Sequence, residues 1–184
     1  MKKHLLLLTG NPGIGKTTAL LKIVQTLRAR GFNVGGMVSR EVRSCGARVG
    51  FEILDLNGSK PRWLAHVNQQ TGPRIGRYRV NLEALESLGV GAILKAVDDS
   101  DVVVIDEIGP MELLSNKFRE TVRRVTESEK PVIGVVHSKA SDAIMSELRK
   151  REDAELFLVT YENRDRLHEI IIEKVFEYLG KEML

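Results

Sequence analysis

Residues 10–17 read GNPGIGKT and match the pattern G-x-x-x-x-G-K-[ST] at every fixed position. An apolar run at residues 4–9 precedes this segment and predicts a short buried strand. Apolar residues at helical spacing follow it, and Gly31 stands where that helix would end. Strand, glycine loop and helix therefore come in the order of a phosphate-binding loop. In such a loop the backbone N–H groups surround a phosphate chain at the positive end of a helix.

We expect this loop to bind a nucleoside triphosphate or diphosphate. Lys16 can reach the β- and γ-phosphates and is a candidate catalytic residue, and Thr17 can offer its hydroxyl to Mg²⁺. An ordinary glycine-rich turn is the alternative, but the Lys-Thr pair and both flanks favour phosphate binding. The expected contacts are Gly10, Asn11, Pro12, Gly13, Ile14, Gly15, Lys16, Thr17 and Thr18.

A second acidic segment follows a run of β-branched residues at 101–106, which predicts a central strand. Ligands gather at the carboxyl ends of parallel strands, so Asp106 is expected close to Thr17, where it would hold Mg²⁺ mostly through water. Glu107 could orient or deprotonate a water aimed at the γ-phosphate. The alternative is that the two acids cap the strand or the following loop. His137 follows another apolar strand and is either a phosphate sensor or a bystander.

Strand and helix patterns alternate along the rest of the chain, which predicts right-handed crossovers and a parallel sheet covered on both faces. Residues 40–43 and 48–55 alternate around a small-residue turn and predict a β-hairpin, which residues 63–65 would extend. We therefore expect a three-layer α/β P-loop fold with a mainly parallel sheet and an antiparallel extension, and a loop at residues 71–81. Further strands are expected at 33–39, 131–136 and 155–160, and helices at 82–97, 118–128, 141–150 and 164–179. The inner face of the last helix is predicted to comprise Leu167, Ile170, Ile171, Lys174, Val175 and Tyr178.

Composition limits the class of protein. A chain of 184 residues with 42% hydrophobic and 29% charged residues suits one domain, residues 1–184, with its own core. The single cysteine excludes an internal disulfide, and the four histidines lie too far apart for a zinc site. The leucine run at residues 5–8 is too short to cross a bilayer and has no cleavage site. We expect a cytoplasmic monomer with no membrane partner, and the net charge of +3 gives no reason to expect a nucleic-acid partner.

The chain resembles the nucleoside-triphosphatase family described from thermophiles and, in humans, as a cancer-related NTPase. The resemblance rests on the glycine loop, on DEIGPMEL at 106–113 and on TYENRD at 160–165. The segments REVR at 40–43, RVGF at 48–51 and PRIGRY at 73–78 also agree with it. The likeness spans nearly the whole chain, and the order of the segments is preserved.

This resemblance implies a RecA-like P-loop core and Mg²⁺-dependent hydrolysis of several nucleoside triphosphates, such as ATP, GTP, CTP and UTP, to diphosphate and phosphate. It also implies a second nucleotide-contacting segment, formed by Val102, Val103, Val104, Ile105, Asp106, Glu107, Ile108 and Gly109. A nucleotide or nucleoside kinase is the main alternative, and an ATPase gated by a nucleic acid or by a partner protein is another. A kinase would transfer phosphate to an acceptor, whereas Glu107 favours water.

Two further hypotheses concern basic residues. Residues 40–43 and 73–79 are rich in arginine and are expected to border the site, where a guanidinium could meet the charge on the γ-phosphate. Asn163 and Arg164 follow the last expected strand, so they would emerge at the same sheet edge as the phosphate loop. Arg164 could stack on any base, and Asn163 could hydrogen-bond it. The alternatives are surface charges for the arginines and a helix cap for Asn163.

Overall fold

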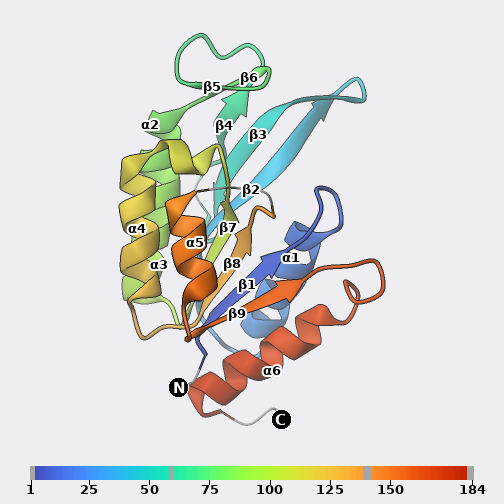
Figure 1. Ribbon diagram of the computed structural model, residues 1–184, viewed down its shortest axis with the longest axis vertical. Helices are drawn as coiled ribbons and strands as arrows, with labels where there is room; N and C mark the ends of the chain where they lie inside the picture. The colour runs from blue at the N-terminus through green and yellow to red at the C-terminus, as the bar shows by residue number, and fades with distance from the viewer. Residues whose placement is uncertain (1–2, 59, 139–141, 182–184) are drawn as a thin grey trace.

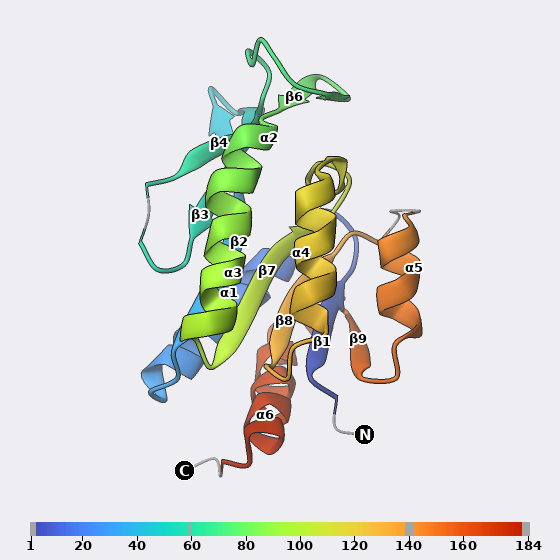
Figure 2. The same cartoon turned by 90° about the vertical axis from the view of Figure 1, so that its left-hand side faces the viewer.

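The computed structural model describes residues 3–58, 60–138 and 142–181. Within these residues, nine strands form one sheet in the order β5-β6-β4-β3-β2-β7-β8-β1-β9, with helices on both faces (Figures 1 and 2). The strands are β1 (Leu5–Thr9), β2 (Val34–Ser44), β3 (Ala47–Asp55), β4 (Arg62–His66), β5 (Arg74–Ile75), β6 (Tyr78–Val80), β7 (Val102–Ile108), β8 (Val132–Val136) and β9 (Ala154–Leu158). The helices are α1 (Lys16–Ala29), α2 (Leu82–Ala84), a π-helical segment (Leu85–Gly89), α3 (Val90–Asp99), a 3₁₀ turn (Glu112–Leu114), α4 (Asn116–Thr126), α5 (Ala143–Lys150) and α6 (Leu167–Leu179).

One half of the sheet is parallel, and its central strands are deeply buried. The start of β2, β7, β8, β1 and β9 pair in parallel, and every residue of β1 and β8 is buried. Leucine and β-branched runs form β1, β7 and β8 because helices cover both of their faces, whereas the edge strand β9 is partly exposed. Helices α1 and α6 cover one face, and α3, α4 and α5 cover the other (Figures 1 and 2). This is the expected three-layer α/β arrangement.

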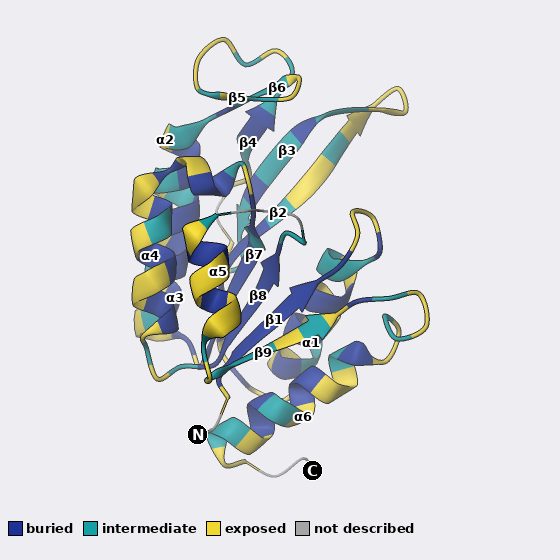
Figure 3. Ribbon diagram, viewed as in Figure 1, coloured by how far each residue is buried: buried dark blue, intermediate teal, exposed yellow. Residues whose placement is uncertain are grey.

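The other half of the sheet is an antiparallel extension. The second part of β2 pairs with β3, and β4, β6 and β5 continue the sheet to its far edge. Figure 3 shows that these strands are more exposed than β1, β7 and β8 of the parallel half. The sequence suggested separate strands at residues 33–39 and 40–43, whereas β2 runs unbroken through both. One strand therefore joins the parallel half to the extension.

Several predicted boundaries were wrong. Residues 71–81 are not all loop, because β5 and β6 form a small antiparallel hairpin there. The helix predicted at 82–97 contains a π-helical turn and continues to Asp99. The helix predicted at 118–128 spans Asn116–Thr126, because Ser115 accepts a hydrogen bond from the Phe118 N–H and caps it at the earlier position. Helix α5 is described from Ala143, and Ser141 lies outside the described residues.

The last helix also differs from expectation. It begins at Leu167 rather than at residue 164, and Ile170 is 46% exposed. Three consecutive isoleucines cannot all face one side of a helix, since successive residues turn by about 100°. Ile171 and Ile172 take the inner face and leave Ile170 outside. The buried set is Leu167, Ile171, Ile172, Val175 and Phe176.

Candidate active site

The phosphate loop connects β1 to α1 at the carboxyl edge of the parallel strands (Figure 1). Gly15 precedes the helix with φ 111°, a conformation that side chains rarely allow. Gly10 approaches the end of β9 so closely that an added Cβ would lie 2.8 Å from the Val159 carbonyl oxygen. The loop glycines are therefore required by backbone geometry. The pattern that suggested phosphate binding also explains how the loop packs.

Lys16 is the first residue of α1, and its side chain lies across the phosphate loop. Its ammonium donates hydrogen bonds to the carbonyl oxygens of Gly10, at 3.1 Å, and Asn11, at 3.2 Å. Its positive charge also opposes the rise in the pKa values of Asp106 and Glu107. The ammonium thus lies close enough to both carboxylates to affect their ionisation. This is where a charge that follows the terminal phosphates of a nucleotide would be expected.

Asp106 lies next to Thr17, as the sheet topology predicts. The Thr17 hydroxyl donates a hydrogen bond to the Asp106 carboxylate, which is almost fully buried at the end of β7. Burial raises the pKa of Asp106 to about 7, and the bond from Thr17 and the charge of Lys16 oppose that rise. The nearby Glu107 adds to the rise by like-charge repulsion. The expected juxtaposition of Thr17 and Asp106 is therefore present.

A β-bulge lets two consecutive acids serve one site. Asp106 and Ile108 pair with the adjacent residues Val135 and Val136 of β8, so Glu107 has no partner in the ladder. In a regular strand, consecutive side chains would point to opposite faces. Here Glu107 lines the same cavity as Lys16 and Thr17. Burial raises the pKa of Glu107, and the charges of Lys16 and His137 oppose this rise.

The residues at this edge fit a hydrated Mg²⁺ ion. Within the described part of the chain, neither Asp106 Oδ2 nor Glu107 Oε1 has a hydrogen-bond partner, although both atoms are buried. Orphaned carboxylate oxygens beside a threonine hydroxyl are the donor set that Mg²⁺ prefers. The described residues contain no group of three or more His, Cys, Asp or Glu side chains that could hold a metal. Mg²⁺ needs no such group, because it keeps much of its water and binds substrate phosphates.

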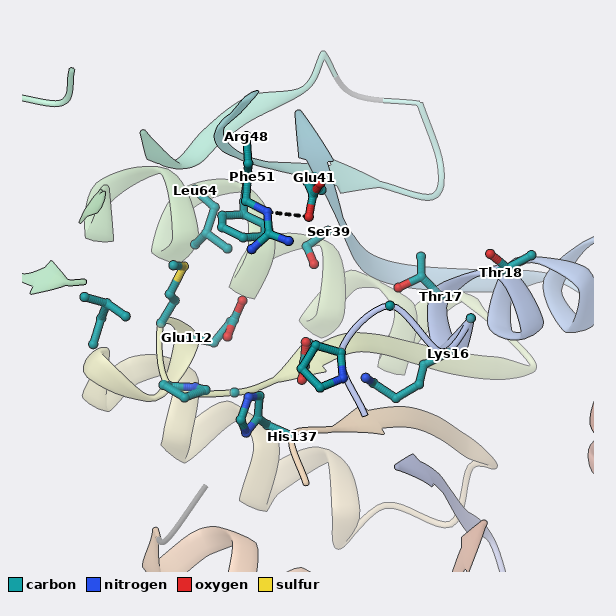
Figure 4. Close-up of a pocket in the computed structure, with 18 residues that line it drawn as sticks. Lys16, Thr17, Thr18, Ser39, Glu41, Arg48, Phe51, Leu64, Glu112 and His137 are labelled. Atoms are coloured by element: carbon teal, nitrogen blue, oxygen red, sulfur yellow. Dashed lines mark ion pairs between the residues drawn. The ribbon is translucent and has the colours of Figure 1, made fainter. Parts of the chain in front are cut away.

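A cavity of about 470 Å³ extends from the loop to the antiparallel extension. Figure 4 shows Lys16 and Thr17 on one side, with Arg48 and Glu41 on the opposite wall. His137 lines the floor, so it faces the cavity as its position after β8 suggested. The wall is partly apolar. The extension contributes the apolar lining residues Phe51, Leu64 and Ile75, and the segment after β7 contributes Met111.

Glu112 is a lining residue that the sequence did not single out. Its carboxylate is buried and accepts hydrogen bonds from the backbone N–H groups of Gly109 and of Glu112 itself. Burial raises the pKa of Glu112 to about 8, and the charges of Glu107 and Asp106 add to the rise. The only signal was its place in the family-like segment at 106–113. A lone glutamate near a helix start otherwise looks like a surface residue.

The arginine-rich segments border the cavity, but not through the arginines that we expected. Residues 40–43 contribute Glu41 to the lining, and residues 73–79 contribute Ile75. The arginines of these segments instead have local partners. Arg40 pairs with Glu52, Arg43 with Glu41, and Arg74, Arg77 and Arg79 donate to the carbonyl oxygens of Gly76, Arg48 and Gly72. Among the described residues, the arginine that lines the cavity is Arg48, the second residue of β3.

Asn163 and Arg164 lie on the other side of the phosphate loop. The Asn163 side chain accepts from the Thr160 N–H at 2.8 Å and donates to the Leu158 carbonyl at 2.7 Å, which closes the loop after β9. The helix-cap alternative was wrong, because α6 begins after Arg166 and has no side-chain cap. Arg164 packs over the exposed Tyr161 ring, 5.1 Å from its centre, and its Nη1 lies 3.5 Å from the Ile14 carbonyl oxygen. Arg164 is thus beside the loop and available for stacking.

The fold and the phosphate loop place this chain in the class of P-loop proteins, which bind nucleoside triphosphates. The chain belongs to the NTPase family, whose model matches residues 5–172. The nucleoside-triphosphatase THEP1 of Thermofilum pendens is 49% identical over 162 residues, which cover 88% of this chain and 89% of that protein. The protein of the same name from Methanopyrus kandleri is 45% identical over 177 residues, or 96% of this chain and 97% of that protein.

Two solved structures share the fold. The crystal structure of THEP1 from Aquifex aeolicus has a TM-score of 0.81 and 30% identity, and the match covers 92% of this chain and 98% of that one. The solution structure of a human cancer-related nucleoside triphosphatase has a TM-score of 0.79 and 34% identity, covering 95% of this chain and 98% of that one. The family resemblance and the three-layer α/β fold inferred from the sequence are confirmed. Among the described residues, no helix is long and apolar enough to cross a membrane.

Proposed function

We propose that this protein hydrolyses nucleoside triphosphates to nucleoside diphosphate and phosphate with the help of Mg²⁺. The observation that carries the proposal is that Lys16, Thr17 and Glu107 line one cavity, with Asp106 hydrogen-bonded to Thr17. The nucleoside-triphosphatase names of its relatives agree with hydrolysis and do not favour a kinase.

The phosphate loop would hold the substrate. Backbone N–H groups of residues 10–18 would surround the β-phosphate, and Lys16 would exchange its carbonyl partners in the loop for β- and γ-phosphate oxygens. Thr17 and Asp106 would hold Mg²⁺, which when bound neutralises charge on the β- and γ-phosphates. Asp106 must be ionised for this role, and its bond from Thr17 and the charge of Lys16 both favour ionisation.

Glu107 would direct the attacking water. The water oxygen forms a bond to the γ-phosphorus, while the bond from that phosphorus to the β–γ bridging oxygen breaks. The bond's electron pair stays on the diphosphate, and a water proton passes to Glu107. The pKa of Glu107 is raised by burial, which makes its carboxylate a stronger base than an exposed one. His137 shares the cavity and would lie near the same water.

The base would lie on the outer side of the loop, against Arg164 and Tyr161. A guanidinium and a phenol ring offer flat faces that stack on purines and pyrimidines alike. Asn163 would mainly hold this loop in shape, since both ends of its amide already bond to the backbone. We therefore propose that ATP, GTP, CTP and UTP are all substrates.

Phosphate release by the purified protein tests this function. We expect free phosphate from all four triphosphates with Mg²⁺ and almost none when EDTA replaces the metal. Added RNA or DNA should not change the rate. Radiolabelled γ-phosphate recovered on an acceptor nucleoside or nucleotide, rather than as free phosphate, would overturn the proposal in favour of a kinase.

A further inference from the structure

We propose that Arg48 is a catalytic residue that bonds the γ-phosphate oxygens as the phosphoryl group is transferred to water. This inference rests on the proposed hydrolysis and identifies a further part of the same site. Transfer spreads negative charge over the γ-phosphate oxygens, and a guanidinium can meet that charge with paired donors. Lys16 approaches from the loop side, so a cation on the opposite wall would meet the charge that Lys16 does not reach.

The position of Arg48 is the first argument. Of the arginines that the structure describes, Arg48 alone lines the cavity that contains Lys16, Thr17 and Glu107. It lies on β3, across the cavity from the phosphate loop (Figure 4). Arg164 also lies near the loop, but it belongs to the outer side and does not line this cavity. Arg48 is therefore the arginine placed to approach the γ-phosphate from the face that water would use.

Arg48 is also held in place before any substrate binds. Its Nε forms an ion pair with Glu41 at 2.5 Å, and its guanidinium lies 5.5 Å from the centre of the Phe51 ring. Phe51 packs edge-on against Tyr78, with the ring centres 5.4 Å apart. Figure 4 shows the Nε edge directed at Glu41 and the terminal nitrogens directed into the cavity. A fixed guanidinium costs less entropy to use than a mobile one.

The neighbouring hairpin strengthens this arrangement. Arg77, at the turn between β5 and β6, donates a hydrogen bond to the backbone carbonyl of Arg48. This bond ties the backbone of Arg48 to the outer hairpin of the sheet. The antiparallel extension thus positions Arg48 from three directions, through Glu41, Phe51 and Arg77.

The charge balance of the cavity also favours a role for Arg48 in binding the γ-phosphate. Glu41 and Glu107 line the cavity, so a γ-phosphate would enter beside two carboxylates; Glu112 also lines it, but its pKa of about 8 leaves it mostly uncharged at neutral pH. A triphosphate brings further negative charge, which the carboxylates would repel. Arg48 is the cation on that side of the cavity. Removing Arg48 should therefore lower kcat most, because negative charge develops on the phosphoryl group during its transfer.

The test compares Arg48→Ala with Arg43→Ala. Arg43 is the matched control because it pairs with the same Glu41, also at 2.5 Å, but does not line the cavity. We expect Arg48→Ala to lower kcat by roughly 10²-fold or more, with KM and ADP affinity nearly unchanged. Arg48→Lys should recover only part of the rate, because an ammonium lacks paired donors. Arg43→Ala should keep the parent kcat.

Two further measurements separate catalysis from a structural role. Free guanidinium should partly restore turnover in Arg48→Ala and leave Arg43→Ala unaffected. Binding of ADP with aluminium fluoride, which resembles the transferring phosphoryl group, should weaken in Arg48→Ala while ADP binding stays normal. Parent-like kcat in Arg48→Ala would overturn the assignment. A parent protein that releases no phosphate would instead overturn the proposed hydrolysis, so the two failures are distinguishable.

Discussion

The two sides of the phosphate loop are built differently. The inner side is the cavity beneath the antiparallel extension, where Asp106, Glu107 and Glu112 have pKa values raised by burial. The outer side, formed by the loop between β9 and α6, is open. Tyr161 there is 71% exposed, and Arg164 lies over its ring.

This difference indicates that the inner side carries out the chemistry and the outer side binds the base. Buried charges are costly, so a cavity that contains several acids is stable only where chemistry or bound cations require it. An exposed aromatic ring with a guanidinium offers stacking without directional base contacts. We therefore expect changes on the inner side to alter kcat and changes on the outer side to alter KM. Lys16 lies between the two sides and should affect both.

The largest effect is expected for Lys16→Ala. This variant removes the charge that would follow the β- and γ-phosphates, so nucleotide affinity should fall on the order of 10²-fold, with turnover lost as well. Isothermal titration with ATP and Mg²⁺ would measure the affinity. Lys22→Ala, an exposed position on the same helix, is the control and should bind like the parent. Unchanged ATP affinity in Lys16→Ala would contradict the whole interpretation of this loop.

Glu107→Gln should separate chemistry from binding on the inner side. Losing the base should slow hydrolysis by roughly 10²-fold while ATP binding stays near normal. Asp106→Asn is the comparison variant, and it should weaken Mg²⁺-dependent binding and turnover together. Single-turnover phosphate release with bound ATP would measure the chemical step. A parent-like rate in Glu107→Gln would move water activation to another residue, and His137 would be examined first.

The sequence could predict the parts of this comparison that depend on local pattern and strand order. The phosphate loop is contiguous, and Asp106 reaches Thr17 because parallel strands present their carboxyl ends at one edge. The strands of the buried half were found because unbroken leucine and β-branched runs are specific signals.

The remaining features depend on long-range geometry. The bulge at Glu107 requires the register between β7 and β8, which no local pattern encodes. Arg48 reaches the cavity only because β3 pairs with β2, whose Glu41 lines the same cavity. In the sequence, Asn163 looks like a helix cap. In the structure its side chain instead bonds to the backbone of Thr160 and Leu158, and α6 begins only at Leu167. These residues could be identified only after the strands had been assembled.

The raised pKa of the buried Glu112 carboxyl group should be visible in the pH dependence of stability. Its pKa is about 8 in the folded protein and 4.5 as the ordinary value, so between these pH values the folded state binds a proton that the unfolded state releases. The free energy of unfolding therefore falls as pH rises through this window. Glu112→Gln should melt roughly 5 °C or more above the parent at pH 8 and about equally at pH 4.

Thermal melts from pH 4 to pH 9 would measure this difference. Glu120→Gln, an exposed position on α4, is the control and should follow the parent curve. Asp106 titrates in the same range, so the difference between variant and parent isolates the contribution of Glu112. An equal melting difference at pH 4 and pH 8 would indicate a packing effect instead of ionisation.

The smallest effect is expected on the outer side, for Arg164→Ala. If Arg164 is a stacking platform, its loss should raise KM several-fold for all four triphosphates with little change in kcat, since one exposed stacking contact contributes about 1 kcal/mol. Arg166→Ala, an exposed position in the same loop, is the control and should leave every KM unchanged. Steady-state kinetics on ATP, GTP, CTP and UTP would measure both variants. A loss confined to one base would show that Arg164 reads a base edge, and a fall in kcat would place Arg164 with the inner side and remove the division between binding and chemistry.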